Sequence, residues 1–573
     1  MTNGGNSPPT RRLIVVCRGD ETGRYDWLPA PRAGDATVAL DGMAAEDLAD
    51  RQALPFDELE TWEQRSAAEH RIDELLAAVR AAPAVTAIEL SGYRLIDFAE
   101  YRLRMEAARL LRGWTLARAL EGVGELACDP TAAPALVMGV RAGIGLDPAT
   151  TPYEIPPEVP GSRVARAAIR PVMRCLAAVS RPARVRVAAV AAGKLILALD
   201  AMTDADLRAA GVATMPFPGL DHGNSAVVSL RRRLPMVATF GGRATGPGPA
   251  VRLPERLDLA SEPQLDSALT VLITRLLDDA ASELAGAVGA LARIERASEL
   301  RALLLPTAAL GASRLLISWA HRRGVRVGVI QHGIYAHREF DGADRSADVV
   351  FAWGEGTAEQ AQGWPEPRPK LLPVGVPGMA VARTRPPVVG LRRALIATSN
   401  AVDAPTVPAA FCKTFVDVLA PGLARMAAAG VELQLRPHPA EDRKYYRRLL
   451  SRHGLDIPIA NDDHFSAAAA RTDILISSAS SVAFEAAALG LPVLMWLGPA
   501  PRWVREEHLV TPWVESSPGM FQRAEEFASL ADDLLDRPAE AFAVAYDLGR
   551  LLARYARPFD PDRFAEGLRM LAA

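Results

Sequence analysis

Short apolar runs alternate with longer amphipathic stretches through the middle of the chain. The apolar runs are nearly continuous, as in strands buried on both faces, and they span 302–305, 326–330, 347–352 and 370–374. The amphipathic stretch 308–323 predicts a helix between the first two strands. Strands that alternate with helices at this spacing predict a parallel, doubly wound sheet.

A second series of the same kind begins further along the chain. Its predicted strands are 393–397, 431–435, 473–476 and 492–497, and its predicted helices are 408–428, 441–453 and one starting at Ser481. The Pro- and Arg-rich stretch 382–387 (ARTRPP) predicts a linker between the two series. We therefore expect two Rossmann-like domains that separate near residue 385.

The first part of the chain has a less regular pattern. It predicts strands at 12–17, 85–90, 184–190 and 236–240, helices at 58–81, 98–119 and 267–300, and Pro/Gly-rich turns at 156–161 and 246–249. Residues 1–10 are mostly small and polar and predict a disordered tail. The predicted divisions are this tail, an elaborated N-terminal domain at 11–385 and a C-terminal domain at 386–573.

Composition narrows the class of protein. A chain of 573 residues with 49% hydrophobic and 23% charged residues is an ordinary globular protein of more than one domain. The net charge of −3 gives no reason to expect a nucleic-acid partner. The scattered cysteines, Cys17, Cys128, Cys175 and Cys412, have no metal-ligand spacing and predict reduced thiols in a cytoplasmic protein.

No segment predicts a signal peptide or a membrane-spanning helix. The best apolar run, Val187 to Leu199, is interrupted by Lys194 and is shorter than the ~20 residues that cross a bilayer. Basic clusters at Arg231–Arg233 and Arg443–Arg448 leave open a peripheral contact with the inner membrane, although clusters this short are usually solvated faces.

Two polar loops of the second series have chemistry suited to an anionic ligand. Arg436-Pro437-His438-Pro439 follows one predicted strand, and a serine-rich loop, 477–481, follows another. A helix that starts at Ser481 directs its free N–H groups and positive dipole end toward an anion. Glu485 lies about one turn further along, where a carboxylate accepts hydrogen bonds from ribose hydroxyls. This combination predicts a site for a nucleotide leaving group.

An ordered set of motifs gives a family resemblance. Gln331-His332-Gly333, a D-x-x-x-A-W-G segment from Asp348 and G-x-P from Gly375 precede the RPHP loop and the S-S-x-S-S-x-x-x-E-A segment with its G-x-P-V. The set resembles bacterial surface-polysaccharide transferases of the GT-B fold: capsule polysaccharide synthesis proteins, polysialyltransferases and CDP-glycerol glycerophosphotransferases. The resemblance covers roughly 300–497. It implies an α/β GT-B fold with two Rossmann-like domains facing across a cleft.

The resemblance also implies roles for single residues. The resemblance implies a CMP- or CDP-linked donor bound mainly by the C-terminal domain, and an acceptor bound by the N-terminal domain. The implied donor contacts are Arg436, His438, Pro439, Ser478, Ser480, Ser481 and Glu485. An inverting transferase needs a base that removes the acceptor's hydroxyl proton, and His332 is the first choice because histidine titrates near neutral pH. A retaining transferase does not need this base, and the sequence does not separate the two mechanisms. Asp341 and Glu355 are rival carboxylate bases and His337 is a weaker one, whereas Asp344 and Asp348 are expected to cap or to bind backbone amides.

Each donor contact has a structural alternative. The serines are good helix caps, Arg436 suits a surface ion pair, and Glu485 suits an exposed helix face. Two D-x-D sequences, Asp204–Asp206 and Asp560–Asp562, follow no clear strand, so we expect no essential metal and no other cofactor. The helix dipole and basic side chains would then stabilise the leaving phosphate. The chain has neither a G-x-x-x-x-G-K-[ST] motif nor a G-x-G-x-x-G after a strand, so kinase, ATPase and dehydrogenase functions lack support.

The sequence thus predicts a metal-independent glycosyltransferase. It would move a sugar from a nucleotide-activated donor to a growing cell-surface polysaccharide or to a lipid-linked glycan acceptor. Three alternatives stay open: a glycerophosphate or other polyol-phosphate transferase, a UDP-sugar 2-epimerase-like enzyme, and a non-catalytic scaffold of a polysaccharide assembly complex. The first of these uses the same cytidine leaving group, so the sequence does not separate sugar transfer from glycerophosphate transfer.

Overall fold

The computed structural model describes most of the chain. The described residues are 11–17, 25–90, 92–120, 122–130, 132–150, 186–190, 193–215, 251–254, 256–294, 299–335, 346–363, 368–379, 388, 390–399, 406–439, 441–460, 465–508 and 517–573. Several predicted features lie outside them: the tail 1–10, the turns 156–161 and 246–249, the strand 236–240, the linker 382–387, Cys175 and Arg231–Arg233.

Three parallel sheets organise the described residues. The first has the order β3-β2-β1-β6 and comprises β1 (Arg11–Val16), β2 (Ala36–Ala39), β3 (Leu54–Pro55) and β6 (Val123–Cys128). The second has the order β12-β11-β10-β9-β7-β8 and comprises β7 (Val187–Val190), β8 (Val212–Met215), β9 (Ala302–Leu305), β10 (Arg326–Ile330), β11 (Val349–Ala352) and β12 (Lys370–Pro373). The third has the order β14-β13-β15-β16-β17 and comprises β13 (Arg393–Ala397), β14 (Glu432–Arg436), β15 (Ile474–Ser478), β16 (Val493–Trp496) and β17 (Met520–Phe521). A small antiparallel hairpin pairs β4 (Glu89–Leu90) with β5 (Tyr93–Arg94).

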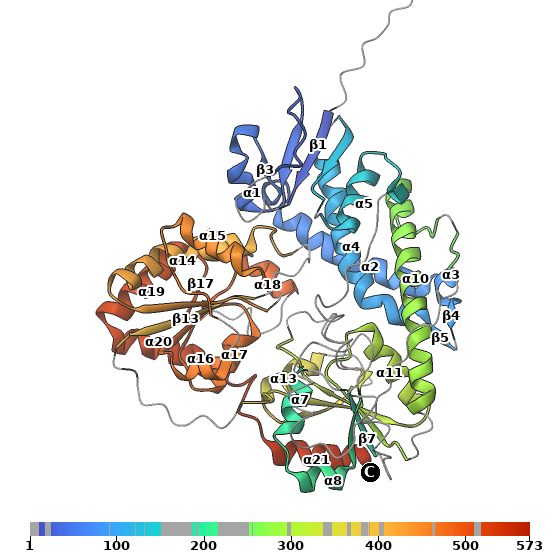
Figure 1. Cartoon of the computed structure of the whole chain (residues 1–573), viewed down its shortest axis with the longest axis vertical. Helices are drawn as coiled ribbons and strands as arrows, with labels where there is room; N and C mark the ends of the chain where they lie inside the picture. The colour runs from blue at the N-terminus through green and yellow to red at the C-terminus, as the bar shows by residue number, and fades with distance from the viewer. Residues whose placement is uncertain are drawn as a thin grey trace, which may run out of the picture.

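The sheets define three units, called here N-terminal, middle and C-terminal (Figure 1). The N-terminal unit holds α1 (Gly42–Asp47), α2 (Trp62–Ala81), α3 (Pro83–Thr86), α4 (Leu95–Ala119) and α5 (Pro134–Gly143). The middle unit holds α7 (Gly193–Asp200), α8 (Asp204–Ala210), α10 (Pro263–Ile294), α11 (Gly311–His321) and α13 (Glu355–Gln360). The C-terminal unit holds α14 (Phe411–Ala428), α15 (Arg443–Arg452), α16 (Phe465–Ala470), α17 (Ser481–Ala488), α18 (Arg502–His508), α19 (Ala524–Asp536) and α20 (Pro538–Leu552).

In the N-terminal unit, helices cover both faces of a short sheet. Alternate residues of β1 point to opposite faces: Ile14 packs toward α1, and Leu13 packs toward α4 and α5. Helices α4 and α5 lie so close that a Cβ on Gly113 would fall 2.0 Å from the carbonyl oxygen of Leu136. Gly139 makes the reciprocal approach to Leu110, so the two glycines set the spacing of this helix pair.

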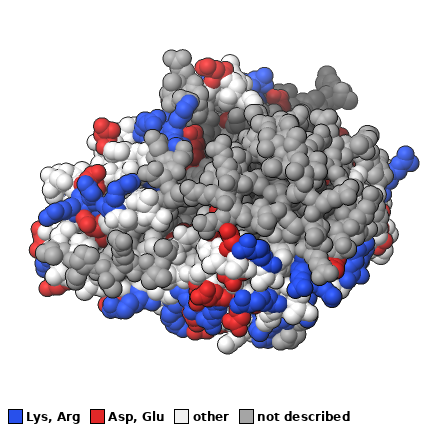
Figure 2. All heavy atoms as spheres, turned by 60° about the horizontal axis from the view of Figure 1, so that its bottom comes forward, with Lys and Arg blue, Asp and Glu red and all other residues white. Residues whose placement is uncertain are grey.

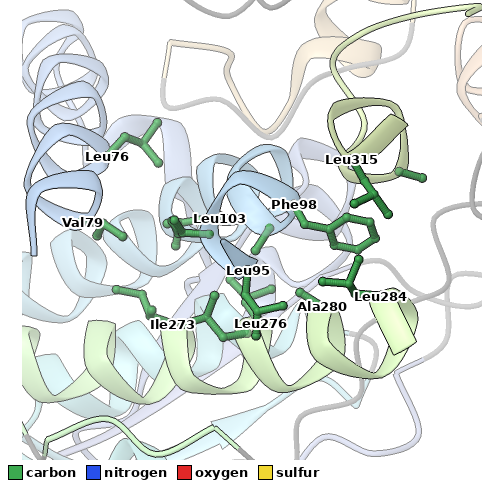
Figure 3. Packing of buried hydrophobic residues seen from close by; sticks show 14 of the residues in the cluster. Leu76, Val79, Leu95, Phe98, Leu103, Ile273, Leu276, Ala280, Leu284 and Leu315 are labelled. Carbon is green, nitrogen blue, oxygen red and sulfur yellow. The ribbon is translucent and has the colours of Figure 1, made fainter. Parts of the chain in front are cut away.

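A helical layer joins the N-terminal unit to the middle sheet. Figure 3 shows apolar side chains of α2, α4, α10 and α11 meeting in one cluster, among them Leu76, Phe98, Leu276 and Leu315. The same cluster includes residues of β9 and β10 in the middle sheet. The range 11–385 therefore holds two parallel sheets. The core of the middle sheet extends over α4 and α10, whereas the sheet of the N-terminal unit packs on α4 and α5 in a separate cluster.

The last helix returns to the middle unit. Helix α21 (Pro561–Ala572) follows the C-terminal unit in sequence but packs against the middle sheet beside α8 (Figure 1). Phe564 is fully buried there, with its ring 4.7 Å from that of Phe351. A Cβ on Gly567 would fall 2.4 Å from the Phe351 ring, so the helix lies tightly on the sheet.

Helices also cover both faces of the C-terminal sheet. Helices α14, α15 and α19 pack on one face, and α16, α17 and part of α20 pack on the other. The middle and C-terminal units are the two Rossmann-like units of the predicted GT-B fold, and the N-terminal unit adds a parallel sheet of its own beyond the predicted helical elaboration.

Opposite charges join the N-terminal unit to the C-terminal unit. Glu46 and Asp47 of α1 pair with Arg448 and Arg452 of α15, and the Tyr445 hydroxyl donates a hydrogen bond to Asp41. The basic cluster Arg443–Arg448, considered above for a membrane contact, is thus partly used within the molecule.

Most predicted elements match within a few residues, and one prediction is wrong. The predicted strand Val85–Leu90 begins instead as the short helix α3, and only Glu89–Leu90 is extended. Pro83 explains the error, because proline is favoured in the first turn of a helix and fixes the φ that a helix needs.

The described surface mixes both signs of charge. On the face in Figure 2, blue and red side chains alternate over the described part of the surface. Among the described helices, none is both long and apolar enough to cross a membrane.

Replacement of Phe564 by alanine should destabilise the protein. The change removes a fully buried ring from the contact between α21 and the middle sheet, so the free energy of unfolding should fall by about 3–5 kcal/mol. Denaturant unfolding checks this, with the exposed Glu566→Ala on the same helix as the control. Equal stability of the two variants would show that α21 does not hold the middle unit.

Acid should weaken the contact between α2 and α18. The Nε2 atom of His508 lies 2.7 Å from the Ser66 hydroxyl. Burial lowers the pKa of His508, an effect that Glu507 and Asp73 oppose and that His70 and Arg104 add to. Because the folded state disfavours the protonated ring, this part of the stability is present above the ordinary histidine pKa of ~6.5 and is lost as the pH falls below it. Melting temperatures from pH 7.5 to 5 should therefore decline more steeply for the wild type than for His508→Gln.

Candidate functional site

The polar loops predicted to bind a ligand meet at one edge of the C-terminal sheet. Strands β14, β13 and β15 are neighbours and parallel, so Arg436, Thr398 and Ser478 emerge side by side at their carboxyl ends. The strand order is 2-1-3-4-5 in chain numbering, which reverses direction between β13 and β15. In such sheets ligands bind outside this reversal point.

Serine hydroxyls span the reversal point. The Ser478 hydroxyl donates a 2.9 Å hydrogen bond to Ser399, which follows β13. The Ser477 hydroxyl turns back to the carbonyl oxygen of Ser478 at 2.7 Å and is buried. Ser478 is buried as well, and its hydrogen bond links the loops that follow β15 and β13, whereas the Ser477 hydroxyl bonds within its own loop.

Helix α17 starts directly after this loop. Ser480 is its N-cap residue in backbone conformation, but its side chain makes no capping hydrogen bond. The Ser481 hydroxyl accepts a 3.0 Å hydrogen bond from the backbone N–H of Ile334 in the middle unit. The alternative role as side-chain caps thus does not apply to Ser480, and Ser481 is held by another unit.

The RPHP loop is held by a carboxylate that sequence reasoning missed. Glu441 accepts a 2.9 Å hydrogen bond from the backbone N–H of His438 and another from the Thr398 hydroxyl. Its second oxygen accepts hydrogen bonds from the Tyr446 hydroxyl at 2.9 Å and the Cys412 thiol at 3.6 Å. An acidic residue three positions after His438 was the available signal in the sequence.

Burial lowers the pKa of His438. The negative charge of the neighbouring Glu441 acts in the opposite direction but has the smaller effect. The ring is therefore neutral at neutral pH and suits a hydrogen bond better than a charge pair with phosphate. Pro437 and Pro439 fix the backbone on either side of it.

Glu485 does not lie on an exposed helix face. It forms a 2.9 Å ion pair with Lys194, which comes from α7 of the middle unit. Lys194 in turn lies over the Trp353 ring, with the ammonium 5.1 Å from its centroid. The lysine was noted in the sequence only as an interruption of an apolar run, and that isolated charge was the signal for its role.

The QHG loop of the middle unit lies against the start of α17. Gln331 is fully buried and bonds to the backbone on both sides, accepting from Trp353 N–H at 2.7 Å and donating to the Gly333 carbonyl at 2.8 Å. A Cβ on Gly333 would fall 2.9 Å from the Ser481 hydroxyl, so glycine permits this approach. His332 is exposed and directly precedes Gly333, the residue that approaches Ser481.

The rival bases have different surroundings. Glu355 starts α13 and forms a 2.8 Å ion pair with Arg557, in the segment that leads to α21. Asp341, His337 and Asp344 lie outside the described residues. Asp348 accepts a 2.6 Å hydrogen bond from the Val327 N–H, as predicted.

The D-x-D sequences serve helix starts. The backbone N–H of Asp206 is bonded to Thr203, the N-cap of α8, and Asp560 caps α21 through Arg563 N–H. Within the described residues, no group of three or more histidine, cysteine, aspartate or glutamate side chains could hold a metal ion.

Glu441→Gln should loosen the RPHP loop. Glutamine has one acceptor oxygen where two are used, so at least one buried donor loses its partner and the free energy of unfolding should fall by ~1–3 kcal/mol. Hydrogen exchange should show a faster amide at His438. The control is Glu432→Gln, because Glu432 is an exposed carboxylate at the start of β14. Unchanged exchange at His438 would show that Glu441 does not hold the loop.

Comparisons with known proteins find similar structures but no family. No protein-family model and no curated protein matches the sequence. A putative UDP-N-acetylglucosamine 2-epimerase from Listeria monocytogenes shares 11% identity at a TM-score of 0.42, over 68% of this chain and 96% of that one. The UDP-GlcNAc 2-epimerase from Neisseria meningitidis bound to UDP-GlcNAc shares 11% at 0.39, over 68% and 99%. MurG from Acinetobacter baumannii shares 12% at 0.37, over 67% and 99%. Similarity this low assigns neither a family nor an activity to the chain.

Proposed function

We propose that the protein is a glycosyltransferase that binds a nucleotide-activated sugar in its C-terminal unit. The observation that carries the proposal is the Ser399–Ser478 hydrogen bond across the reversal point of the sheet, directly before the start of α17. Hydroxyl donors and a helix N-terminus at a reversal point suit the phosphate of a nucleotide.

Each part of the donor has a matching group. The phosphate would lie at the start of α17 with Ser478, Ser480 and Ser481, and the neutral His438 ring would donate a hydrogen bond to it. The ribose would lie against Glu485, one turn into the helix. The choice of cytidine, as CMP or CDP, rests on the sequence resemblance alone.

The acceptor would approach from the middle unit. Its hydroxyl oxygen would attack the anomeric carbon while the bond to the donor phosphate breaks, and a base would take the proton. His332 is the first choice because the neighbouring Ile334 bonds to Ser481, and Asp341 and Glu355 remain rivals. The helix dipole would stabilise the leaving phosphate. The acceptor is proposed to be a growing cell-surface polysaccharide or a lipid-linked glycan, reached in the cytoplasm with a peripheral contact to the inner membrane.

Nucleotides should stabilise the protein against heat. CMP, CDP, UDP, GDP and ADP are compared by thermal shift on the wild type and on the double variant Glu485→Ala/His438→Ala. A nucleotide at about 100 times its dissociation constant should stabilise by ~2.7 kcal/mol. We expect a shift with CMP or CDP that the double variant loses and that Glu432→Ala keeps.

The other outcomes of this experiment separate the alternatives. A shift with UDP alone would replace the cytidine donor by a UDP-sugar and favour an epimerase-like enzyme. No shift with any nucleotide would overturn the proposal and leave the scaffold. If cytidine nucleotides bind, product analysis with CMP-sugar and CDP-glycerol distinguishes sugar transfer from glycerophosphate transfer.

A further inference from the structure

Helix α17 presents one face to the middle unit. Ser481 and Glu485 are four residues apart and so lie on the same side of the helix. Ser481 is bonded to the Ile334 N–H and Glu485 to Lys194, so both residues contact the middle unit. The two residues proposed to bind phosphate and ribose are thus both fixed by groups outside their own sheet.

Lys194 comes from a reversal point as well. The middle sheet has the order β12-β11-β10-β9-β7-β8, which reverses between β7 and β9, and α7 is the helix that follows β7. Helix α17 follows β15, next to the reversal point of the C-terminal sheet. The Lys194–Glu485 ion pair therefore joins the two places where these sheets would each bind ligands.

Both side chains of the pair are largely shielded from solvent. The relative exposure is 19% for Lys194 and 17% for Glu485, and the ammonium also rests on the buried Trp353 ring. Shielded, hydrogen-bonded ion pairs hold their geometry better than exposed ones. Among the described residues, Lys194 is the partner of one oxygen of Glu485, and the other oxygen accepts no hydrogen bond.

We infer that Lys194 is a positioning residue that sets the preference of the donor site for ribonucleotides. By binding one carboxylate oxygen, it orients Glu485 so that the other oxygen accepts a hydrogen bond from a ribose hydroxyl. This inference rests on the proposed function, because it requires a nucleotide at α17. The inference goes beyond the proposed function in one respect. The middle unit, together with the nucleotide-binding unit, determines whether a ribonucleotide or a deoxyribonucleotide is preferred.

The test compares ribose with deoxyribose. Dissociation constants are measured by calorimetry for CDP and 2′-deoxy-CDP, with UDP and 2′-deoxy-UDP in parallel, on the full-length protein. The wild type should prefer the ribonucleotide about tenfold, the size expected for one hydrogen bond to a charged group. Lys194→Met should reduce this preference to about twofold, and Lys194→Arg should largely restore it.

Two controls separate positioning from stability. Lys413→Met removes a lysine that is about as shielded as Lys194. It breaks the pair with Glu46 of the N-terminal unit and the pair with Asp417 of the same helix. It should leave the ribose preference unchanged. The double variant Lys194→Met/Glu485→Ala should be no less selective than Glu485→Ala alone, because the lysine acts through the carboxylate.

The outcomes distinguish failure of the inference about Lys194 from failure of the proposed function. Binding by the wild type with the same ribose preference in Lys194→Met overturns the inference and leaves the proposed function in place. Loss of preference in Lys413→Met as well shows a general effect of stability and also overturns it. No binding of either nucleotide pair by the wild type overturns the proposed function and the inference together.

Discussion

Parallel strand pairing is the constraint on which the rest of this structure depends. Every strand pair of the three sheets is parallel, so the loops after neighbouring strands must emerge together at one edge. Residues far apart in sequence, such as Ser399, His438 and Ser478, become neighbours for this reason alone. The helices needed to connect parallel strands cover both faces, which leaves the edge as the place for polar chemistry.

The candidate site lies where the middle and C-terminal sheets present such edges to each other. Lys194 reaches Glu485, and the backbone of Ile334 reaches Ser481. These polar contacts are supported by a hydrophobic cluster in which Trp353 and Val376 of the middle unit pack with Phe484 and Tyr555 of the C-terminal unit. The chain itself also links the two units, because α21 follows the C-terminal unit in sequence and packs its buried Phe564 on the middle sheet. The relative position of the two units is therefore fixed by packing as well as by charge.

The N-terminal unit adds contacts to both of the others. It shares a core with the middle sheet through α4 and α10, and it pairs acidic α1 with basic α15 of the C-terminal unit. Ser66, His508 and Glu507 form a further polar contact between α2 and α18. The sequence predicts an elaborated N-terminal domain but no separate sheet in it, because the strands of this sheet are short and their pattern gives no third series of clear alternation. The position of the N-terminal unit between the two Rossmann-like units depends on contacts between side chains that are far apart in sequence.

The sequence by itself determined the local structure and the chemistry of each loop. Apolar runs predict most strands within a few residues, and the residue types of the RPHP and serine-rich loops lead to the hypothesis of a phosphate site. Those features depend on neighbours along the chain, where periodicity and proline act directly. Val85–Leu90 was mispredicted because apolar composition outweighed the helix-starting Pro83.

Only the tertiary structure showed that Glu441 holds the RPHP loop, that Glu355 pairs with Arg557, and that Lys194 reaches Glu485. The contact of Glu441 with the RPHP loop depends on the packing of α15 beside its sheet. The contact of Lys194 with Glu485 depends on the docking of one sheet edge on another. Contacts between residues nearly 300 positions apart leave no periodic trace in a single sequence, because the energy that selects them comes from the packing of whole units.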